Sequence, residues 1–386
     1  MFNKIDENIL NKINVNNYKN NVIDCIVYGN KTLVKDNIFF NNIKKPYESI
    51  DFINAICAKL NIDDIINLAK SDEVKYISST SKVLSCVNVS KKIINVENYK
   101  IKSNGDFSVA VIDTGVYPHL DFVLGKNNLI AFHDVINNRT IPYDDNGHGT
   151  FVSGLIFSKG FMSCGKYSGV DPSAQLVSVK ALDCNGETSS VNILKAMQWV
   201  YDNRVKYNIK VVCMSFGSVL LNSNDPLIIG AESLWDAGII VCSASGNAGP
   251  LYSTIKSPGA SNKIITVGAL NDYRDEFGNY DVSKFKVADF SSRGPALNNY
   301  KPDCVVSGVD VCSACNYGLN KKFYNLMSGT SVATPIVAGV ASLILKNNKL
   351  FTPNQVKNFI LNNCKQISGD RNAEGKGLFA FKNSNR

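Results

Sequence analysis

Apolar and polar residues follow two different patterns along this chain, and the pattern changes near residue 105. In the first part, strand-like runs occur at 22–28, 50–60 and 74–83. Residues 62–69 instead have the spacing of an amphipathic helix. The first part therefore predicts a small α+β unit at residues 21–87.

Two polar segments border this unit. Residues 1–20 are rich in Asn and weakly periodic, which predicts a loosely held, flexible extension. Residues 88–105 are also polar and predict a connector. A second, larger domain is therefore expected at residues 106–386.

In the second part, nearly continuous apolar runs predict buried strands at 108–115, 175–182, 211–217, 239–247 and 263–270. Helical patterns lie between them, near 190–205 and 226–237. Strands that are apolar on both faces are covered by helices on both sides, so we expect a three-layer α/β/α fold with a mostly parallel sheet. Ligands of such sheets bind beyond the carboxyl ends of the strands.

A serine stands where a long apolar run begins, within residues 325–346, and this run predicts a buried helix. The serine is Ser331, in the sequence Gly329-Thr330-Ser331. A nucleophile there would lie at the positive end of the helix dipole, with backbone N–H groups available to an oxyanion. The same residues also suit an ordinary helix N-cap, so the pattern alone leaves both roles open.

Three other polar residues follow strands or glycine-rich turns. Asp113 ends an apolar strand, where burying a carboxylate is costly without a partner. His148, one of only three histidines, lies between two glycines. Asn247 follows another strand, and its side-chain N–H is a possible oxyanion donor. Each residue alone also suits a structural role, but Asp, His, Asn and Ser in this order are the parts of a base-activated serine nucleophile.

Charge, hydropathy and cysteine content exclude several classes of protein. The net charge is +8, but the lysines are scattered, which predicts a solvated surface and no nucleic-acid partner. No signal peptide and no uninterrupted membrane-length run is apparent, so a cytoplasmic protein with no membrane partner is expected; export without a signal peptide stays open. Eleven cysteines, several of them in apolar runs, predict reduced thiols. The single CxxC, Cys312–Cys315, lacks the second pair of a typical zinc site.

Six short segments carry a family resemblance that spans about residues 108–364. They are VIDTG, NGHGT, SASGN, FSSRGP, KPD and GTSVATP. The chain resembles the subtilisin-like serine proteases, the subtilases, and the GKYSGV run resembles their intracellular branch. The order acid, histidine, serine is the one found in subtilisin. The resemblance implies a serine endopeptidase that hydrolyses peptide bonds.

The resemblance also implies catalytic roles. Ser331 is expected to be the nucleophile, His148 the general base and then acid, and Asp113 the residue that orients the imidazole. Asn247 is expected to complete the oxyanion hole together with the Ser331 backbone N–H. No cofactor is implied, and no metal site is expected, because the segment after His148 lacks the acidic pattern of a calcium loop.

For substrate binding, the resemblance implies two edge segments that pair with an extended peptide. They are Ser215, Phe216 and Gly217, and Gly186, Glu187 and Thr188. It also implies that one wall of the pocket for the side chain before the cleaved bond is made by Ala244, Ser245 and Gly246.

Lys256 is expected at the floor of that pocket, where the family often has a small residue. A cation there predicts a preference for an acidic side chain before the cleaved bond. In the alternative interpretation, Lys256 extends to solvent and does not affect specificity.

The N-terminal unit resembles a subtilase propeptide, which templates folding, inhibits the enzyme and is removed by self-processing. By that resemblance its last strand, near Ser78–Cys86, enters the cleft and is cut. Residues 80–90 contain no Asp or Glu, which conflicts with an acidic preference unless cleavage occurs elsewhere, for example after Glu97. The alternative is a permanent structural domain.

Two other functions stay open. A regulatory pseudoprotease would fold in the same way and bind a peptide or partner without cutting it. A metal-binding protein could use Asp113, His119, Asp121, His133 and His148 as ligands. The subtilase hypothesis leaves His119 and His133 as structural residues.

Overall fold

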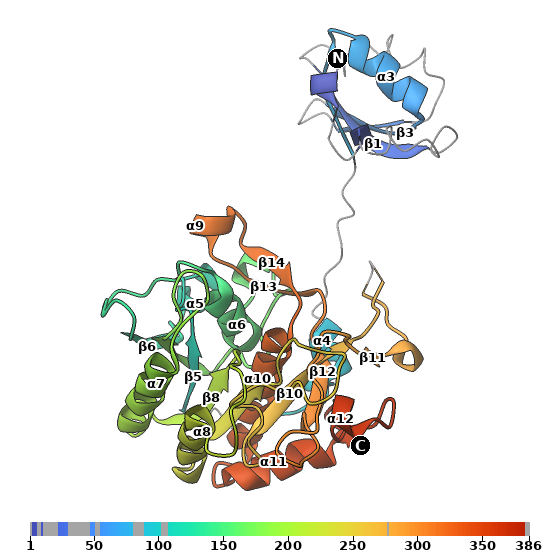
Figure 1. Cartoon of the computed structure of the whole chain (residues 1–386). Helices are drawn as coiled ribbons and strands as arrows, with labels where there is room; N and C mark the ends of the chain where they lie inside the picture. The colour runs from blue at the N-terminus through green and yellow to red at the C-terminus, as the bar shows by residue number, and fades with distance from the viewer. Residues whose placement is uncertain are drawn as a thin grey trace. The chain divides into compact units, whose positions relative to one another are not determined.

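The structure is a computed structural model that describes residues 2–5, 9–10, 22–29, 47–50, 55–79, 89–101, 107–275 and 278–382. The chain divides into two compact units, Met1–Val83 and Leu84–Arg386. Each unit has a β-sheet (Figure 1) and a hydrophobic core of its own.

The first unit is a four-stranded antiparallel sheet with one long helix. The strand order is β2 (Tyr47–Ile50), β3 (Ala55–Leu60), β1 (Ile23–Gly29) and β4 (Val74–Ser79). Helix α3 (Ile62–Lys70) begins at a capping box between Asn61 and Asp64 and buries Ile65 and Leu68 in the core of this unit. A 3₁₀ turn, η1 (Phe2–Lys4), precedes the sheet in sequence.

The prediction of one strand at 50–60 is wrong. β2 ends at Ile50 and β3 begins at Ala55, and the two strands pair with each other. Residues 51–54, which lie outside the described residues, include Asp51 and Asn54, two residue types that favour turns. Along the sequence, the alternation of these two antiparallel strands does not differ from that of a single strand.

The segment that was predicted as a connector at 88–105 packs on the second unit along its described part. It forms α4 (Val89–Ile93) and the 3₁₀ turn η3 (Val96–Asn98). Ile94 is fully buried, and the Tyr99 ring stacks on the Phe381 ring with 4.0 Å between centroids. Because only a few residues of this polar segment make these contacts, its composition did not predict that it packs on the second unit.

The second unit contains one large sheet. Seven parallel strands lie in the order β12 (Cys304–Ser307), β10 (Ile265–Asn271), β9 (Ile240–Ala244), β8 (Ile209–Met214), β5 (Ser108–Asp113), β7 (Gln175–Lys180) and β6 (Leu129–Asp134). Three shorter strands add to this sheet: β16 (Leu378–Phe379) pairs with β12, β15 (Cys364–Lys365) pairs with β16, and β11 (Lys286–Val287) pairs with the end of β10. This confirms the predicted mostly parallel sheet.

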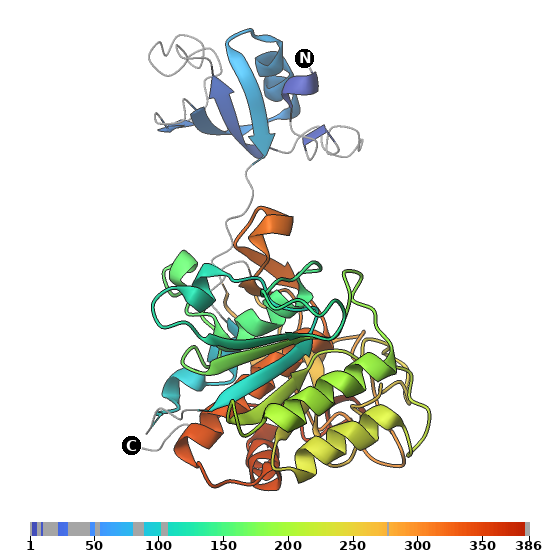
Figure 2. The same cartoon turned by 90° about the vertical axis from the view of Figure 1, so that its left-hand side faces the viewer.

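Helices cover the large sheet on both faces (Figures 1 and 2). α6 (His148–Phe157) and α10 (Thr330–Asn347) pack against each other, and α10 lies against β8, β9 and β10. α7 (Ser190–Asn203) and α8 (Pro226–Asp236) form the other helical layer. The α/β/α class predicted from the sequence is therefore confirmed, and the core runs along the sheet beneath α10.

The remaining elements lie around these layers. They are α5 (Leu120–Val123), η4 (Phe161–Ser163), η5 (Val282–Lys284), the hairpin of β13 (Val311–Ala314) and β14 (Tyr324–Met327) with α9 (Tyr317–Asn320) at its tip, α11 (Pro353–Asn362) and α12 (Arg371–Glu374). By length and composition α10 is a weak candidate for a membrane span, but 89% of it is buried inside the protein. Its apolar side chains are therefore already covered by the fold.

Candidate active site

Asp113 and His148 meet at the carboxyl end of the central strand. β5 ends at Asp113, and α6 begins at His148. The His148 Nδ1 atom lies 2.7 Å from Asp113 Oδ1, and the two side chains are 22% and 1% exposed. Asp113 Oδ1 also accepts a hydrogen bond of 2.8 Å from the Thr114 backbone N–H. Because Nδ1 donates to the carboxylate, Nε2 is left as the basic atom of the neutral ring.

The surroundings of His148 favour its charged form. Burial opposes a charge on the imidazole, but the Asp113 carboxylate, through its charge and its hydrogen bond, and the Asp144 carboxylate outweigh it. The pKa of His148 is therefore raised above its usual value of 6.5. A ring that gains a proton this readily is suited to act as a general base.

The turn before His148 is held by Asp144. One carboxylate oxygen of Asp144 accepts from the backbone N–H of Gly147 at 2.8 Å, and the other accepts from the Thr150 N–H at 2.9 Å. These bonds satisfy free N–H groups at the start of α6. Gly147 has φ of 103°, in the left-handed region where glycine is favoured. The sequence therefore fixes the direction in which α6 leaves the sheet.

Ser331 and Asn247 both lie next to Gly329. A Cβ atom at position 329 would lie 2.9 Å from Ser331 Oγ and 3.4 Å from Asn247 Nδ2. Asn247 Oδ1 accepts from the Thr330 N–H and from the Thr330 hydroxyl, both at 2.9 Å. Because both bonds are to Oδ1, Nδ2 points the other way. A side chain at position 329 would therefore crowd both the hydroxyl and the amide donor, and glycine avoids this.

The two residue pairs lie at the same end of the sheet. Ser331 is in the first turn of α10, and His148 is the first residue of α6, which packs beside α10. The Gly246 N–H donates to the Thr330 hydroxyl at 3.2 Å and ties the loop after β9 to the start of α10. All four residues predicted for catalysis thus lie at the end of the sheet where β5 and β9 finish and α6 and α10 begin.

A groove runs between the two predicted edge segments. A cavity of about 350 Å³ is lined by Gly186, Glu187, Thr188, Phe216 and Gly217 together with Leu182, Ser189, Ser190, Ile193, Ser218 and Leu227. Ser215, the remaining residue of that pair of segments, directly follows β8 and is buried. Leu182, Ile193 and Leu227 contribute apolar surface to this lining, so the groove can accept an apolar side chain of an extended peptide.

The stem of Lys256 lies against Gly217 of one predicted edge segment and against Gly246 of the predicted pocket. A Cβ atom at position 217 would lie 2.7 Å from Lys256 Cβ, and one at position 246 would lie 2.5 Å from Lys256 Cγ. The Lys256 backbone N–H donates to the Ser245 carbonyl at 2.9 Å. Ala244 ends β9 next to them and is buried. The Lys256 ammonium makes no hydrogen bond or ion pair within the described ranges of the chain.

His119 and His133 have structural contacts. His119 Nδ1 accepts from the Asp121 N–H at 3.1 Å, and Nε2 lies 2.9 Å from the Phe323 carbonyl. Burial lowers the pKa of His119, so its ring is neutral. The His133 ring stacks on Trp199 at 4.8 Å. No three His, Cys, Asp or Glu side chains come together as a metal site in the described part of the protein, so the metal-binding alternative has no support there.

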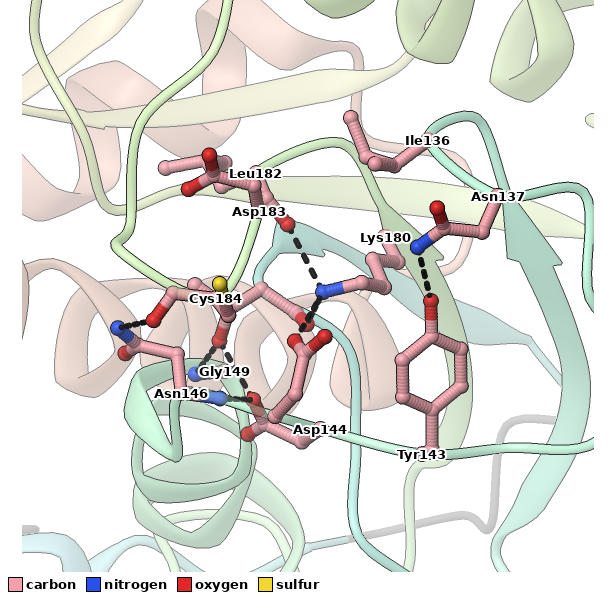
Figure 3. A network of polar contacts seen from close by, with 12 residues as sticks. Ile136, Asn137, Tyr143, Asp144, Asn146, Gly149, Lys180, Leu182, Asp183 and Cys184 are labelled. Carbon is pink, nitrogen blue, oxygen red and sulfur yellow. Dashed lines mark hydrogen bonds and ion pairs between the residues drawn. The ribbon is translucent and has the colours of Figure 1, made fainter.

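The sequence analysis did not identify three residues that support the site, Asp144, Asn146 and Lys180. Lys180 is fully buried at the end of β7, and its ammonium bonds to the Thr114 carbonyl at 2.7 Å and to the Asp145 carboxylate at 2.6 Å (Figure 3). A lysine inside the otherwise apolar run QLVSVKAL was the available signal, because a buried charge requires partners.

Comparisons with known proteins give the same picture. The model of the subtilase family matches residues 104–377. The chain is 40% identical over 369 residues to the serine protease AprX of Bacillus subtilis (strain 168), which covers 89% of this chain and 81% of that protein. It is 31% identical to the thermostable alkaline protease of Halalkalibacterium halodurans, with 84% and 81% covered. Among solved structures, the S41 psychrophilic protease is similar with a TM-score of 0.64 at 27% identity, covering 76% of this chain and 97% of that one.

Proposed function

Since this chain belongs to the subtilase family and is a serine endopeptidase, we propose that Ser331, His148 and Asp113 form its catalytic triad, with Asn247 in the oxyanion hole. The observation that carries the proposal is that two residue pairs lie at the end of the sheet where β5 and β9 finish. His148 contacts Asp113 at 2.7 Å, and Ser331 Oγ and Asn247 Nδ2 both lie next to Gly329.

In this mechanism Ser331 Oγ attacks the peptide carbonyl carbon while His148 Nε2 takes the hydroxyl proton. The negative charge that develops on the carbonyl oxygen is stabilised by Asn247 Nδ2 and the Ser331 N–H. His148 then gives the proton to the leaving amine as the C–N bond breaks, and an acyl-enzyme ester remains. Water, deprotonated by His148, hydrolyses that ester. Asp113 keeps the Nδ1 proton in place and stabilises the imidazolium.

The activated serine gives a direct test. A fluorophosphonate reagent should add once per enzyme molecule, and digestion with mass spectrometry should place the adduct on Ser331, because only a base-activated hydroxyl reacts quickly. Heat-unfolded protein is the control and should not react. An adduct on another serine, or none on folded protein freed of its N-terminal unit, would contradict the assignment.

For substrate binding we propose that an extended peptide lies between Ser215–Gly217 and Gly186–Thr188, with its backbone paired to both segments. An apolar side chain of the peptide would fill the 350 Å³ groove between them. The side chain before the cleaved bond would enter the space bounded by Ala244–Gly246 and Lys256.

Lys256 is proposed to select an acidic side chain at that position. Replacing it with methionine keeps the packed stem and removes the charge, so kcat/KM for a Glu substrate relative to a Phe substrate should fall by about 10- to 100-fold, as expected for loss of a charge-assisted bond. Steady-state kinetics on two peptides that differ only at this residue measure the ratio. Lys349→Met, at an exposed lysine after α10, is the matched control. An unchanged ratio in Lys256→Met would favour the alternative in which the ammonium points to solvent.

The N-terminal unit, residues 21–87, is proposed to be an inhibitory propeptide and the partner of the enzyme in its own chain. Its separate sheet and core support an independently folding unit. Processing is proposed to occur before Val89, because the Asn95 side-chain amide donates to the Phe381 carbonyl at 2.9 Å and Ile94 is buried in the second unit. A cut after Glu97 would divide this packed segment. Of the proposed cleavage strand, near Ser78–Cys86, Ser78 and Ser79 end β4, and residues 80–86 lie outside the described residues.

We also propose that the enzyme works in a reducing, cytoplasmic environment on polypeptide substrates. Cys213 and Cys242 support this, because they are free thiols in the core of adjacent strands. Burial raises the pKa of Cys213 to about 12. Neither thiol is therefore reactive, and neither is needed for a disulfide framework.

A further inference from the structure

The turn that carries His148 is joined to a substrate-binding segment by one side chain. Asn146 Oδ1 accepts from the His148 backbone N–H at 3.1 Å, and Asn146 Nδ2 donates to the Cys184 carbonyl at 2.9 Å. Figure 3 shows Asn146 between α6 and the loop that follows β7. Cys184 lies two residues before Gly186, the first residue of the proposed peptide-binding edge. The side chain of Asn146 thus links the backbone of the general base to the loop that leads into the peptide-binding segment.

The segment 183–187 is a compact turn that is held together by its own hydrogen bonds. The Asp183 carboxylate accepts from the N–H groups of Asn185 and Glu187, both at 2.9 Å, and the Asp183 N–H donates to the Glu187 carbonyl at 2.9 Å. Because these bonds fix the turn internally, a peptide bound at Gly186–Thr188 restrains Cys184 as well. The Cys184 carbonyl is the group that Asn146 holds.

Lys180 fixes the base of the same arrangement. Its ammonium donates to the Leu182 carbonyl at 2.9 Å, to the Thr114 carbonyl next to Asp113, and to the Asp145 carboxylate next to Asn146. The start of the loop after β7, the end of β5 and the turn before His148 are therefore anchored to one buried lysine. Because Lys180 fixes these three points, the bond from Asn146 to the Cys184 carbonyl sets how the rest of the loop after β7 lies against the turn before His148.

We propose that Asn146 is a positioning residue that couples peptide binding at Gly186–Thr188 to the placement of His148. A peptide long enough to engage this edge then gains in kcat and not only in affinity, because remote binding energy orders the general base. The inference rests on the proposed triad and deepens it by defining the productive substrate as an extended peptide that reaches the edge segment.

The experiment compares two anilide substrates with the same residue before the cleaved bond, one with no further residues and one extended by three alanines. The wild-type enzyme should show a higher kcat on the long substrate. Asn146→Asp keeps an acceptor for the His148 N–H but loses the donor to the Cys184 carbonyl. The kcat gain on lengthening should fall by about tenfold in this variant, the scale expected when a catalytic group is slightly misplaced.

Asn185→Asp is the matched control, because it makes the same chemical change in the adjacent turn, where no side-chain bond to the histidine turn exists in the described structure. It should keep the wild-type gain. Active-site titration corrects kcat for inactive protein, and any effect of the new charge on the His148 pKa acts on both substrates and cancels in the ratio. A wild-type gain in Asn146→Asp, or no gain in the wild type, would overturn the coupling. Hydrolysis of either substrate by the wild type bears on the triad separately.

Discussion

Replacing Ser331 with alanine is expected to lower kcat by about a millionfold, the loss found when the nucleophile of such a triad is removed. Only the hydroxyl oxygen is deleted, and no hydrogen bond to it exists among the described residues, so the thermal midpoint should stay close to that of the wild type. Progress curves on a peptide anilide and a thermal melt measure the two quantities. Ser233→Ala, the same change on the exposed face of α8, should retain activity. Hydrolysis at more than a trace level in a folded Ser331→Ala protein would disprove the assignment.

The same variant tests the zymogen proposal. Intact mass should show loss of the residues before Val89 in the wild type over time, and the Ser331→Ala chain should stay at full length. Loss in both would show that another protease makes the cut. A wild type that remains intact but hydrolyses peptides would make residues 21–87 a permanent domain. The position of the cut also bears on Lys256, since residues 80–90 have no acidic side chain.

Replacing Asp113 with asparagine is expected to lower kcat by about ten-thousandfold with little change in fold. Asp113 Oδ1 accepts from both His148 Nδ1 and the Thr114 N–H. An asparagine that turns its amide toward His148 would require Nδ1 to accept, which places the proton on Nε2 and removes the base. The charge that stabilises the imidazolium is lost in either orientation.

The pH dependence of this variant gives a second measurement. In the wild type, kcat/KM should rise with pH through the raised pKa of His148, because only the neutral ring is a base. Burial lowers the pKa of His148 and the Asp113 carboxylate raises it, so this pKa should fall when the Asp113 charge is removed. The acidic limb of the profile should therefore move to lower pH while the rate falls. Asp202→Asn, on the surface of α7, should leave the limb in place. If the acidic limb of Asp113→Asn stayed at the wild-type pH, the Asp113 charge would not be what raises the pKa of His148.

Much of the fold could be predicted because its signals are local. A parallel sheet leaves long apolar runs, and β5, β7, β8, β9 and β10 each lie within or close to a run predicted from the sequence. The helices predicted near 190–205 and 226–237 are α7 and α8. The prediction was wrong where two antiparallel strands have one continuous alternation, at 50–60, because period alone does not mark a turn.

The sequence by itself determined which residues are candidates for the site and the order in which they occur along the chain. Polar side chains at the ends of apolar strands and beside glycines marked the candidates, because burying them without a function or a partner is costly, and the resemblance to the subtilases implied their roles. Only the tertiary structure decided which partner each one has. Asp144 and Asp145 are closer to His148 in the sequence, yet the Nδ1 contact is with Asp113, 35 residues away.

The same holds for Lys180, Asn146 and Lys256. Their contacts to Thr114, Cys184 and Gly217, respectively, join segments that are far apart along the chain. The register of β5 with β7 places Asp113 opposite Lys180, and no local pattern records a register between strands more than 60 residues apart. Spacing in the sequence therefore fixes which groups are available, and the packing of the sheet and its loops decides which of them meet.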